Sequence, residues 1–272
     1  MALSTKVSGT WKEVNGVYTR VGGSWKTVSN IHTRVNGVWK EVYALAGGND
    51  EYTVLLLHGD GVDGSTTIID SSTSGKTVTP DGNAQIDTAQ SKFGGASIYF
   101  DGANSYLWTA DSTDWYFGTG DWTIDFWFRM DDLPGVGAYY SILQQWKIGD
   151  GTNRWVLSVK NASGNLEWTY VNEDDNVNTI DVRNTQTSPS ADTWYHFAIT
   201  RASNVHRMFI DGTQIGTSVT DATAHANRTA SLYIGCAPDK TSDYKGWIDE
   251  LRISKGIARW TADFTPPAKA YS

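Results

Sequence analysis

Cysteine is almost absent from this sequence, since Cys236 is the only one among 272 residues. A single cysteine excludes an intramolecular disulfide, so a stable fold has to come from a packed core. Long apolar runs are also absent, and Met1–Gly9 lacks the hydrophobic stretch of a signal peptide. We therefore expect no membrane insertion, and synthesis without a signal peptide.

Carboxylate pairs with catalytic spacing are missing as well. The few glutamates are Glu13, Glu41, Glu51, Glu167, Glu173 and Glu250. Retaining glycoside hydrolysis needs two carboxylates about 5 Å apart, yet neighbours such as Asp249 and Glu250 point to opposite faces of a strand. No nucleophile elbow, zinc-protease motif or phosphate-binding loop occurs. The sequence predicts a protein without enzymatic activity, although aspartate pairs from different strands stay open.

Basic residues are too few for a nucleic-acid-binding protein. The net charge of the chain is −8. Met1–Tyr43 carries six Lys and Arg against two Glu, a balance of +4, which leaves −12 for the remainder. An acidic remainder binds nucleic acid poorly, whereas the basic N-terminal part suits an acidic protein surface. We therefore predict partners other than nucleic acid.

What the sequence has in abundance is aromatic residues, 12% of the chain, together with a repeat of seven residues. From Ser8 to Val42 the units read SGTWKEV, NGVYTRV, GGSWKTV, SNIHTRV and NGVWKEV. Units that begin with Asn-Gly, Gly-Gly or Ser-Asn exclude a helix, because these residues destabilise it. Asn-Gly and Gly-Gly are typical of two-residue hairpin turns. The repeat therefore predicts a β-meander with the strands Thr10–Val14, Val17–Val21, Ser24–Val28, Ile31–Val35 and Val38–Val42.

Two-residue turns also fix which residues of neighbouring strands face each other. In this register one row alternates tryptophan and arginine, as Trp11, Arg20, Trp25, Arg34 and Trp39. Each exposed pair of guanidinium and indole contributes ~0.5–1 kcal/mol. Because such short strands bury little core, we expect residues 1–43 to serve attachment or oligomerisation. A solvated spacer, or a ligand site on the tryptophans, is the alternative.

The Gly-rich stretch 44–50 (ALAGGND) predicts a linker, and 51–272 a single further domain. Trp122–Met130 alternates apolar and polar residues, as a strand with one buried face does. Further strands are expected at Thr53–His58, Arg154–Lys160, Leu166–Val171, Trp194–Arg201, Val205–Ile210, Thr213–Thr217, Ser231–Cys236 and Trp247–Ser254. Short strands separated by turn residues are typical of a two-sheet β-sandwich. The predicted fold class is all-β.

Six segments of this second domain carry a resemblance. They are LLLHGDGVDGSTTIIDSS (Leu55–Ser72), FGGASIYFDGANSYL (Phe93–Leu107), FGTGDWTIDFWFR (Phe117–Arg129), TWYHFAITR (Thr193–Arg201), MFIDGTQIG (Met208–Gly216) and GWIDELRISKGIARWTADFTPP (Gly246–Pro267). They resemble, in the same order, the laminin-G-like domains of the concanavalin A-like lectin/glucanase superfamily, in the versions found in tailed-phage virion proteins. The resemblance covers nearly all of Asp50–Pro267 and implies a jelly-roll sandwich of two antiparallel sheets. The tryptophan repeats more weakly resemble segments that precede such domains in phage structural proteins.

The resemblance also implies a recognition domain, often for glycans and sometimes with a calcium ion. For calcium it points to Asp60, Asp63 and Asp249, with the capping of turns as the alternative role of these carboxylates. Glycan recognition uses flat aromatic faces with polar side chains beside them. Tryptophans inside the family-like segments are expected to be scaffold. The ligand candidates are therefore Trp108, Trp146, Trp168, Tyr170 and Asn172.

The sequence thus predicts a non-enzymatic phage virion protein of the tail-fibre or receptor-binding type, whose jelly roll binds a host-surface glycan. By analogy with tail fibres we expect a homo-oligomer, with a trimer favoured. The chain is expected to be made in the host cytoplasm and to contact other virion proteins through its N-terminal repeats. Two alternatives stay open, a capsid or tail decoration protein without sugar binding and a glycoside hydrolase.

Overall fold

The computed structural model describes residues 4–7, 10–13, 18–21, 24–27, 30–35, 38–44, 49–147, 149, 153–174, 177–237, 239 and 242–272. The chain forms two compact units, one of residues 1–48 with 271–272 and one of residues 49–270. Apart from one 3-10 turn, η1 (Thr113–Trp115), the elements in these ranges are β-strands. The all-β prediction is therefore confirmed. In the described ranges, no helix has the length and apolar character needed to span a membrane.

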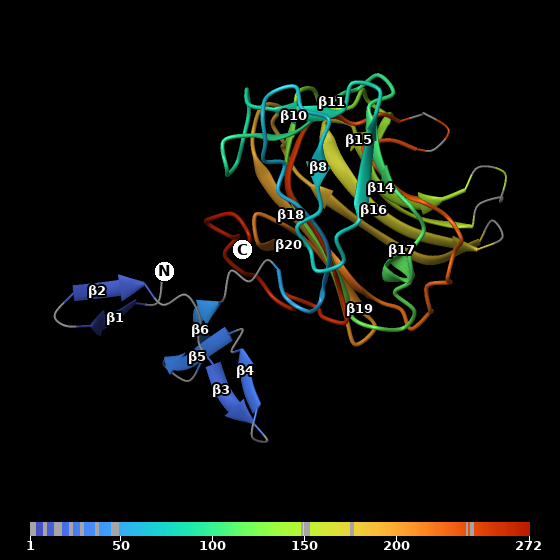
Figure 1. Cartoon of the computed structure of the whole chain (residues 1–272). Coiled ribbons are helices and arrows are strands. Elements are labelled where there is room, and N and C mark those ends of the chain that lie inside the picture. Colours follow the sequence, from blue (N-terminus) through green and yellow to red (C-terminus); the bar gives the residue numbers. More distant parts are fainter. Residues whose placement is uncertain are drawn as a thin grey trace. The chain divides into compact units, whose positions relative to one another are not determined.

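The first unit consists of short antiparallel hairpins (Figure 1). Its strands are β1 (Ser4–Val7), β2 (Thr10–Glu13), β3 (Tyr18–Val21), β4 (Ser24–Thr27), β5 (Asn30–Val35) and β6 (Val38–Ala44). They pair as β1–β2, β3–β4 and β5–β6 in three separate two-stranded sheets. Val21 pairs with Ser24 and Val35 with Val38. Gly-Gly and Asn-Gly therefore separate paired strands by two residues, as predicted.

The predicted single row of alternating tryptophan and arginine is wrong in its continuity. Within β3–β4 and β5–β6 the predicted register is present, with the pairs Arg20–Trp25 and Arg34–Trp39. Trp11, however, pairs with Lys6. The cause is the strand Ser4–Val7, which the repeat-based prediction left out and which pairs with β2. Because β2 pairs with this extra strand and not with β3, the row is divided between separate sheets.

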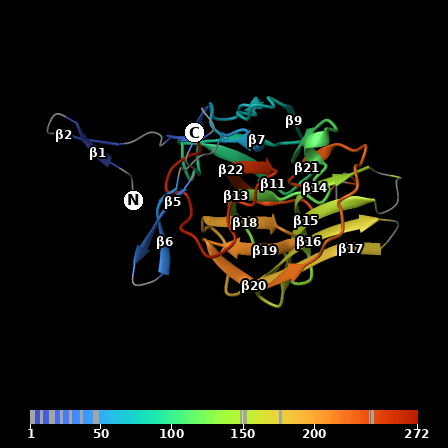
Figure 2. The same cartoon turned by 90° about the horizontal axis from the view of Figure 1, so that it is seen from below.

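The second unit is a sandwich of two antiparallel eight-stranded sheets, as predicted (Figures 1 and 2). The first sheet has the order β10-β11-β22-β13-β18-β19-β20, with β7 also paired to β22. Its strands are β7 (Thr53–Leu57), β10 (Gln85–Asp87), β11 (Ser97–Asp101), β13 (Trp122–Met130), β18 (Tyr195–Ala202), β19 (Val205–Ile210), β20 (Thr213–Thr220) and β22 (Lys245–Lys255). The second sheet has the order β17-β16-β15-β14-β21-β12-β9-β8. Its strands are β8 (Ile68–Ile69), β9 (Thr77–Asp81), β12 (Tyr106–Thr109), β14 (Tyr139–Trp146), β15 (Arg154–Ala162), β16 (Asn165–Asp174), β17 (Val177–Gln186) and β21 (Leu232–Ile234).

The core between the sheets is rich in aromatic side chains. Alternate residues of β13 from Trp122 to Met130 point inward, and all of these inward-facing residues are buried. From the facing sheet, Trp168 stacks on Phe197 with ring centroids 4.3 Å apart. Packing of this kind stabilises the fold through the apolar area that it buries and through about 0.5–1.5 kcal/mol for each aromatic pair. The large aromatic content of the sequence is therefore mostly used inside the sandwich.

The outer face of the first sheet is covered by the chain itself. Residues 257–267 cross β13 and β18, where Thr123 Oγ1 donates to the carbonyl oxygen of Ile257 at 3.1 Å and Thr200 Oγ1 to that of Trp260 at 2.9 Å. A Cβ atom on Gly212, whose φ is +76°, would lie 2.0 Å from the carbonyl oxygen of Phe264. Only glycine allows this close approach without strain. The covering segment buries polar side chains of that face. The outer face of the second sheet, in contrast, carries a groove.

Candidate functional site

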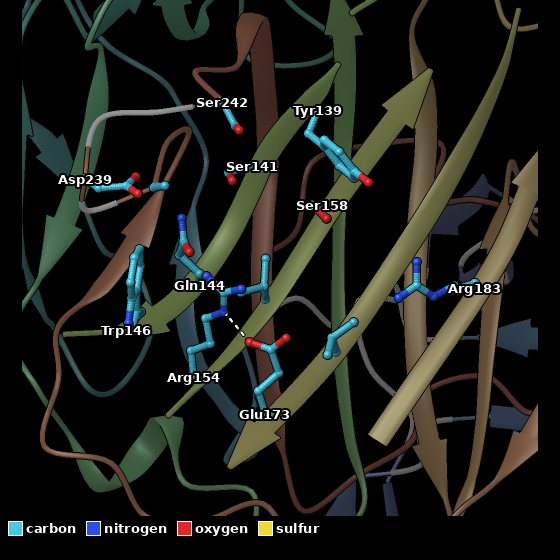
Figure 3. A pocket seen from close by; sticks show the side chains of 13 residues that line it. Tyr139, Ser141, Gln144, Trp146, Arg154, Ser158, Glu173, Arg183, Asp239 and Ser242 are labelled. Atoms are coloured by element: carbon cyan, nitrogen blue, oxygen red, sulfur yellow. Dashed lines mark hydrogen bonds and ion pairs between the residues drawn. The ribbon is translucent and has the colours of Figure 1, made fainter. Parts of the chain in front are cut away.

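A groove lies on the outer face of the second sheet, over β14, β15 and β16 (Figure 3). The pairing of these strands places their outward residues in rows. Three such rows are Trp146–Arg154–Glu173, Gln144–Val156–Val171 and Ser141–Ser158–Thr169. A fourth row, Tyr139–Lys160–Glu167, lies at the opposite end of the same strands. Most of the groove is thus built on strands, which hold its side chains in fixed positions, and Ala237, Asp239 and Ser242 of the segment between β21 and β22 complete the lining.

A β-bulge sets the composition of this face. The register between β14 and β15 shifts between Ser141 and Leu143, so Ile142 is the extra residue of β14. One inserted residue changes which of the following side chains point outward. Because of the bulge, Gln144 and Trp146 point to the same side of the sheet as Ser141. Without it, these two side chains would point into the core.

The floor of the groove is partly apolar, and hydrogen-bonding groups lie around it. Val156 and Val171 form the apolar part, and the hydroxyl groups of Ser141 and Ser158 lie beside them. Gln144 contributes its side-chain amide, which donates to the carbonyl oxygen of Cys236 at 2.7 Å. This bond fixes the orientation of the amide, so its oxygen is held in a defined place. The cavity has a volume of about 240 Å³.

Trp146 and the ion pair beside it form one end of the groove. The Arg154 guanidinium lies 5.1 Å from the centre of the Trp146 ring, and its Nε donates to Glu173 Oε2 at 2.6 Å. Asp239, from the chain segment that follows β21, lines the same end. Charged groups that are paired in this way present both donors and acceptors in a fixed geometry. Arg183 of β17 is likewise paired with Asp181, at 2.8 Å.

The groove therefore combines an indole, hydroxyl and amide groups, and charges that are paired with each other. Its lining contains two arginines, one glutamate and one aspartate, so no large excess of either charge develops. A site of this composition suits a neutral ligand that has an apolar face and several hydroxyl groups. It is poorly suited to a strongly charged ligand, which needs an uncompensated partner.

Comparison with known proteins places this architecture in a family. Residues 100–259 match the family described as concanavalin A-like lectin/glucanases superfamily. This match spans more than half of the chain. The chain belongs to the concanavalin A-like lectin/glucanase superfamily.

Solved structures with a similar fold include binding domains of other proteins. The binding domain of Paraclostridial Mosquitocidal Protein 1 has a TM-score of 0.57 at 20% identity, over 76% of this chain and 50% of that one. The receptor binding domain of botulinum neurotoxin D has a TM-score of 0.55 at 16% identity, with the same two coverages of 76% and 50%. For the binding domain of botulinum neurotoxin serotype G the TM-score is 0.56 at 17% identity, over 75% and 48%. The chain spans about half the length of these structures, and the likeness concerns the fold. No curated protein matches the sequence.

Two of the sequence-predicted ligand residues lie on the outer face of this superfamily domain. Trp146 lines the groove. Trp108 of β12 lies in the same cross-strand row as Gln144, with Tyr233 of β21 between them. At a spacing of about 4.8 Å per strand, Trp108 is roughly 10 Å from Gln144. It therefore belongs to the same face but not to the lining of the cavity.

The other three predicted ligand residues point into the core. Trp168, Tyr170 and Asn172 are alternate residues of β16 and are each 0% exposed. The indole of Trp168 donates to Gln186 Oε1 at 3.1 Å, and the Tyr170 hydroxyl lies 2.7 Å from His225 Nε2. The physical reason is the two-residue period of a strand, which turns the apolar set inward. The outward set of β16 is mostly polar and includes Glu167, Thr169 and Glu173, with Val171 as its apolar member.

Of the three predicted calcium ligands, two lie close together. Asp249 of β22 is 0% exposed, and its Oδ2 accepts the backbone N–H groups of Lys92 and Phe93 at 2.7 and 3.0 Å. Within the described ranges, no donor reaches its buried Oδ1. Burial raises the pKa of Asp249 to about 7, with further contributions from the carboxylates of Glu250 and Asp60. A buried oxygen without a donor, among other carboxylates, is a position that a cation would stabilise.

Asp63 is separate from this pair. Its Oδ1 accepts the backbone N–H and the hydroxyl of Thr88 at 3.0 and 3.2 Å, which is the turn-stabilising role given above as the alternative. In the described part of the chain, no cluster of three or more His, Cys, Asp or Glu side chains is arranged to hold a metal ion. The residues that fit a cation are therefore Asp60 and Asp249, and backbone oxygens would have to supply the other ligands.

Sequence reasoning missed most of the groove. Gln144, Arg154 and Glu173 were not predicted as ligand residues, and Tyr139 was not considered. The signal that was available is the alternation of Arg154–Lys160 and Leu166–Val171, whose polar residues mark an exposed sheet face. Which strands are neighbours, and hence which polar residues meet, could not be taken from that alternation.

A second cavity, of about 620 Å³, lies on the first sheet and has a different character. It is lined by Lys92, Phe93, Trp127, Trp194, Asp211 and Pro266–Ala268. The Lys92 ammonium lies 3.8 Å from the centre of the Trp127 ring and already occupies one face of it. This cavity offers few hydrogen-bonding side chains, so the groove on the second sheet is the better candidate for a hydroxyl-rich ligand.

Proposed function

We propose that this chain is a non-enzymatic recognition protein whose groove over β14, β15 and β16 binds a saccharide. The observation that carries the proposal is the row Trp146–Arg154–Glu173 at the end of an open groove. Stacking on an aromatic ring, with donors and acceptors beside it, is the chemistry that recognises a pyranose. The lectin-like fold supports recognition in general, but it does not identify the ligand.

The charges of the groove favour binding over hydrolysis. Glycoside hydrolysis needs one carboxylic acid that donates a proton and a second carboxylate. Glu173, the glutamate that lines the cavity, accepts a charge-assisted hydrogen bond from Arg154 at 2.6 Å. This pairing supports a role in binding the hydroxyl groups of a ligand. It gives no support to the glycoside hydrolase alternative.

A glycan array tests the proposal. We expect the intact chain to be retained by one or more saccharides of a bacterial cell envelope, and the Trp146→Ala variant to lose at least about tenfold in affinity, as a central aromatic contact does. The melting temperature of the variant serves as the folding control. If no saccharide is bound at millimolar concentration, the decoration-protein alternative is favoured instead.

We also propose that Asp60 and Asp249 hold a calcium ion. A cation bound only to the folded chain raises stability by RT ln(1 + [Ca²⁺]/Kd), about 2.7 kcal/mol at one hundred times Kd. The melting temperature should therefore fall on adding EDTA and recover on adding calcium. Asp249→Asn should abolish this response, and Asp63→Asn should keep it. A melting temperature that ignores EDTA would contradict the calcium proposal.

For the N-terminal unit we propose attachment, to a virion and to other copies of the chain. The proposal rests on the separate compact unit of hairpins and on its charge of +4 against −12 for the rest of the chain. The proposal includes the predicted role in a phage particle, a trimeric state and synthesis in the host cytoplasm. A chain lacking residues 1–43 should then have the mass of a monomer in analytical ultracentrifugation. If the truncated chain kept the oligomeric mass of the parent, the contacts between copies would lie in the sandwich instead.

A further inference from the structure

The two ends of the groove repeat the same arrangement of side chains. At one end a tryptophan of β14 lies beside an arginine of β15 and a glutamate of β16, in the row Trp146–Arg154–Glu173. At the other end the row is Tyr139–Lys160–Glu167. In each row the cation approaches the aromatic ring, with Arg154 at 5.1 Å and Lys160 at 5.2 Å from the ring centres. Both ends of these strands thus carry an aromatic ring, a cation and a carboxylate in the same order, and Tyr139 is the member of the second row that lines the groove.

The distance between these ends exceeds the size of one sugar ring. Arg154 and Lys160 are six residues apart on β15, a strand that pairs regularly with β16. At about 3.4 Å per residue, the two rows are roughly 20 Å apart. Tyr139 and Trp146 both line the groove, which therefore extends along the strands rather than into the domain.

Between the two ends, the groove carries mostly short side chains along its axis, and Gln144 is the longer one among them. Ser141 and Ser158 form one middle row, and Val156 and Val171 belong to the next. Small hydroxyl and aliphatic side chains leave space above the sheet for a ligand that passes from one aromatic ring to the other. Tyr139 is 42% exposed, so one side of its ring is accessible to such a ligand.

We infer that the groove binds an unbranched, neutral saccharide chain lying along β14, with Trp146 and Tyr139 as two separate stacking positions. The inference rests on the proposed function and specifies its ligand class. At both ends a cation and a carboxylate are cross-strand neighbours, which favours hydroxyl groups over carboxylate or sulfate groups. A cavity of about 240 Å³ is too small to enclose a chain of several sugar rings. The groove thus contacts one side of a chain and does not require a chain end.

Calorimetric titration with neutral gluco-, galacto- and manno-oligosaccharides, from disaccharides to hexasaccharides, tests this inference. In the series that binds, affinity should increase with chain length until both rings are reached. Tyr139→Ala should lower the affinity for the longest members about 2- to 10-fold, the range of one aromatic contact. It should leave the affinity for the disaccharide unchanged. Trp146→Ala should weaken the binding of every member.

The control variant is Tyr116→Ala, which removes a tyrosine of similar exposure, 38%, whose ring also lies near a lysine, Lys255 at 5.7 Å. Because Tyr116 lies outside the groove lining, its loss should change no affinity. If the hexasaccharide binds no tighter than the disaccharide, or Tyr139→Ala leaves its affinity unchanged, this inference is overturned while the proposed function stands. If none of the saccharides in these series or on the array binds, both are overturned.

Discussion

Replacing Trp168 by alanine is expected to lower the free energy of unfolding by about 3–5 kcal/mol, the cost of deleting a large buried aromatic side chain. Trp168 is 0% exposed, and its ring stacks on Phe197 at 4.3 Å and lies 5.0 Å from Phe128. The substitution also leaves Gln186 without its indole donor, which adds to the loss. Urea denaturation followed by tryptophan fluorescence and circular dichroism measures the effect.

Trp146→Ala is the matched control for this substitution. Trp146 is half-buried on the outer face, beside the Arg154 guanidinium, and not in the core, so its removal should cost about 1 kcal/mol or less. The two tryptophans therefore separate folding from binding. Equal stability of Trp168→Ala and the parent would contradict the burial of Trp168, and a large loss in Trp146→Ala would assign that residue to the scaffold.

Replacing Asp125 by asparagine is the second substitution with a large expected effect. Asp125 is 0% exposed and binds Arg252, with its Oδ1 2.9 Å from Nε and its Oδ2 3.1 Å from a terminal nitrogen. His196 Nε2 lies 3.6 Å from Oδ2. Removing the negative charge takes away this counter-ion of the buried guanidinium, which costs about 3–5 kcal/mol. In contrast, Asp181→Asn breaks an exposed pair and should cost at most about 1 kcal/mol.

The same ion pair gives stability a defined acid dependence. Burial alone raises the pKa of Asp125, but the Arg252 guanidinium and the His196 side chain together outweigh burial and lower the pKa to about 2. A carboxyl whose pKa is lower in the folded than in the unfolded chain contributes stability above pH 4. That contribution, roughly 2 kcal/mol, is lost as the pH falls from 4 towards 2. Chemical denaturation at pH 6, 4 and 3 should show this loss in the parent, and a smaller loss in Asp125→Asn. Parallel curves for the two chains would contradict the assigned ion pair.

Much of the fold could be predicted from the sequence because its strands obey simple patterns. The alternation in Trp122–Met130 correctly identified the inward face of β13. Gly-Gly and Asn-Gly correctly located two of the hairpin connections in the N-terminal unit. The predicted continuous row of tryptophan and arginine was wrong because Ser4–Val7, outside the repeat, is also a strand and pairs with β2. Local patterns thus predicted strands well and predicted their partners less well.

The candidate site was harder to predict because it depends on pairing between strands that are distant in sequence. The bulge at Ile142 makes Gln144 and Trp146 point outward, and no residue type in β14 predicts a bulge at this position. The covering segment 257–267 lies over β13 and β18 on the outer face of the first sheet, and its position also depends on residues that are distant in sequence. Trp168 and Tyr170 were assigned to the ligand because of polar neighbours, although those neighbours occupy the opposite face of β16. Trp146 was predicted for a similar reason and does line the groove.

One measurement tests the central proposal, that the second sheet carries the saccharide site. Dissociation constants for the best saccharide from the array should be determined for the parent chain, Trp146→Ala and Trp194→Ala. Trp194 lines the other cavity, on the first sheet, so it controls for the loss of an accessible tryptophan. We expect Trp146→Ala to weaken binding at least about tenfold and Trp194→Ala to leave it unchanged. Unchanged binding by Trp146→Ala, with loss of binding by Trp194→Ala, would contradict the proposal and place the ligand on the opposite sheet.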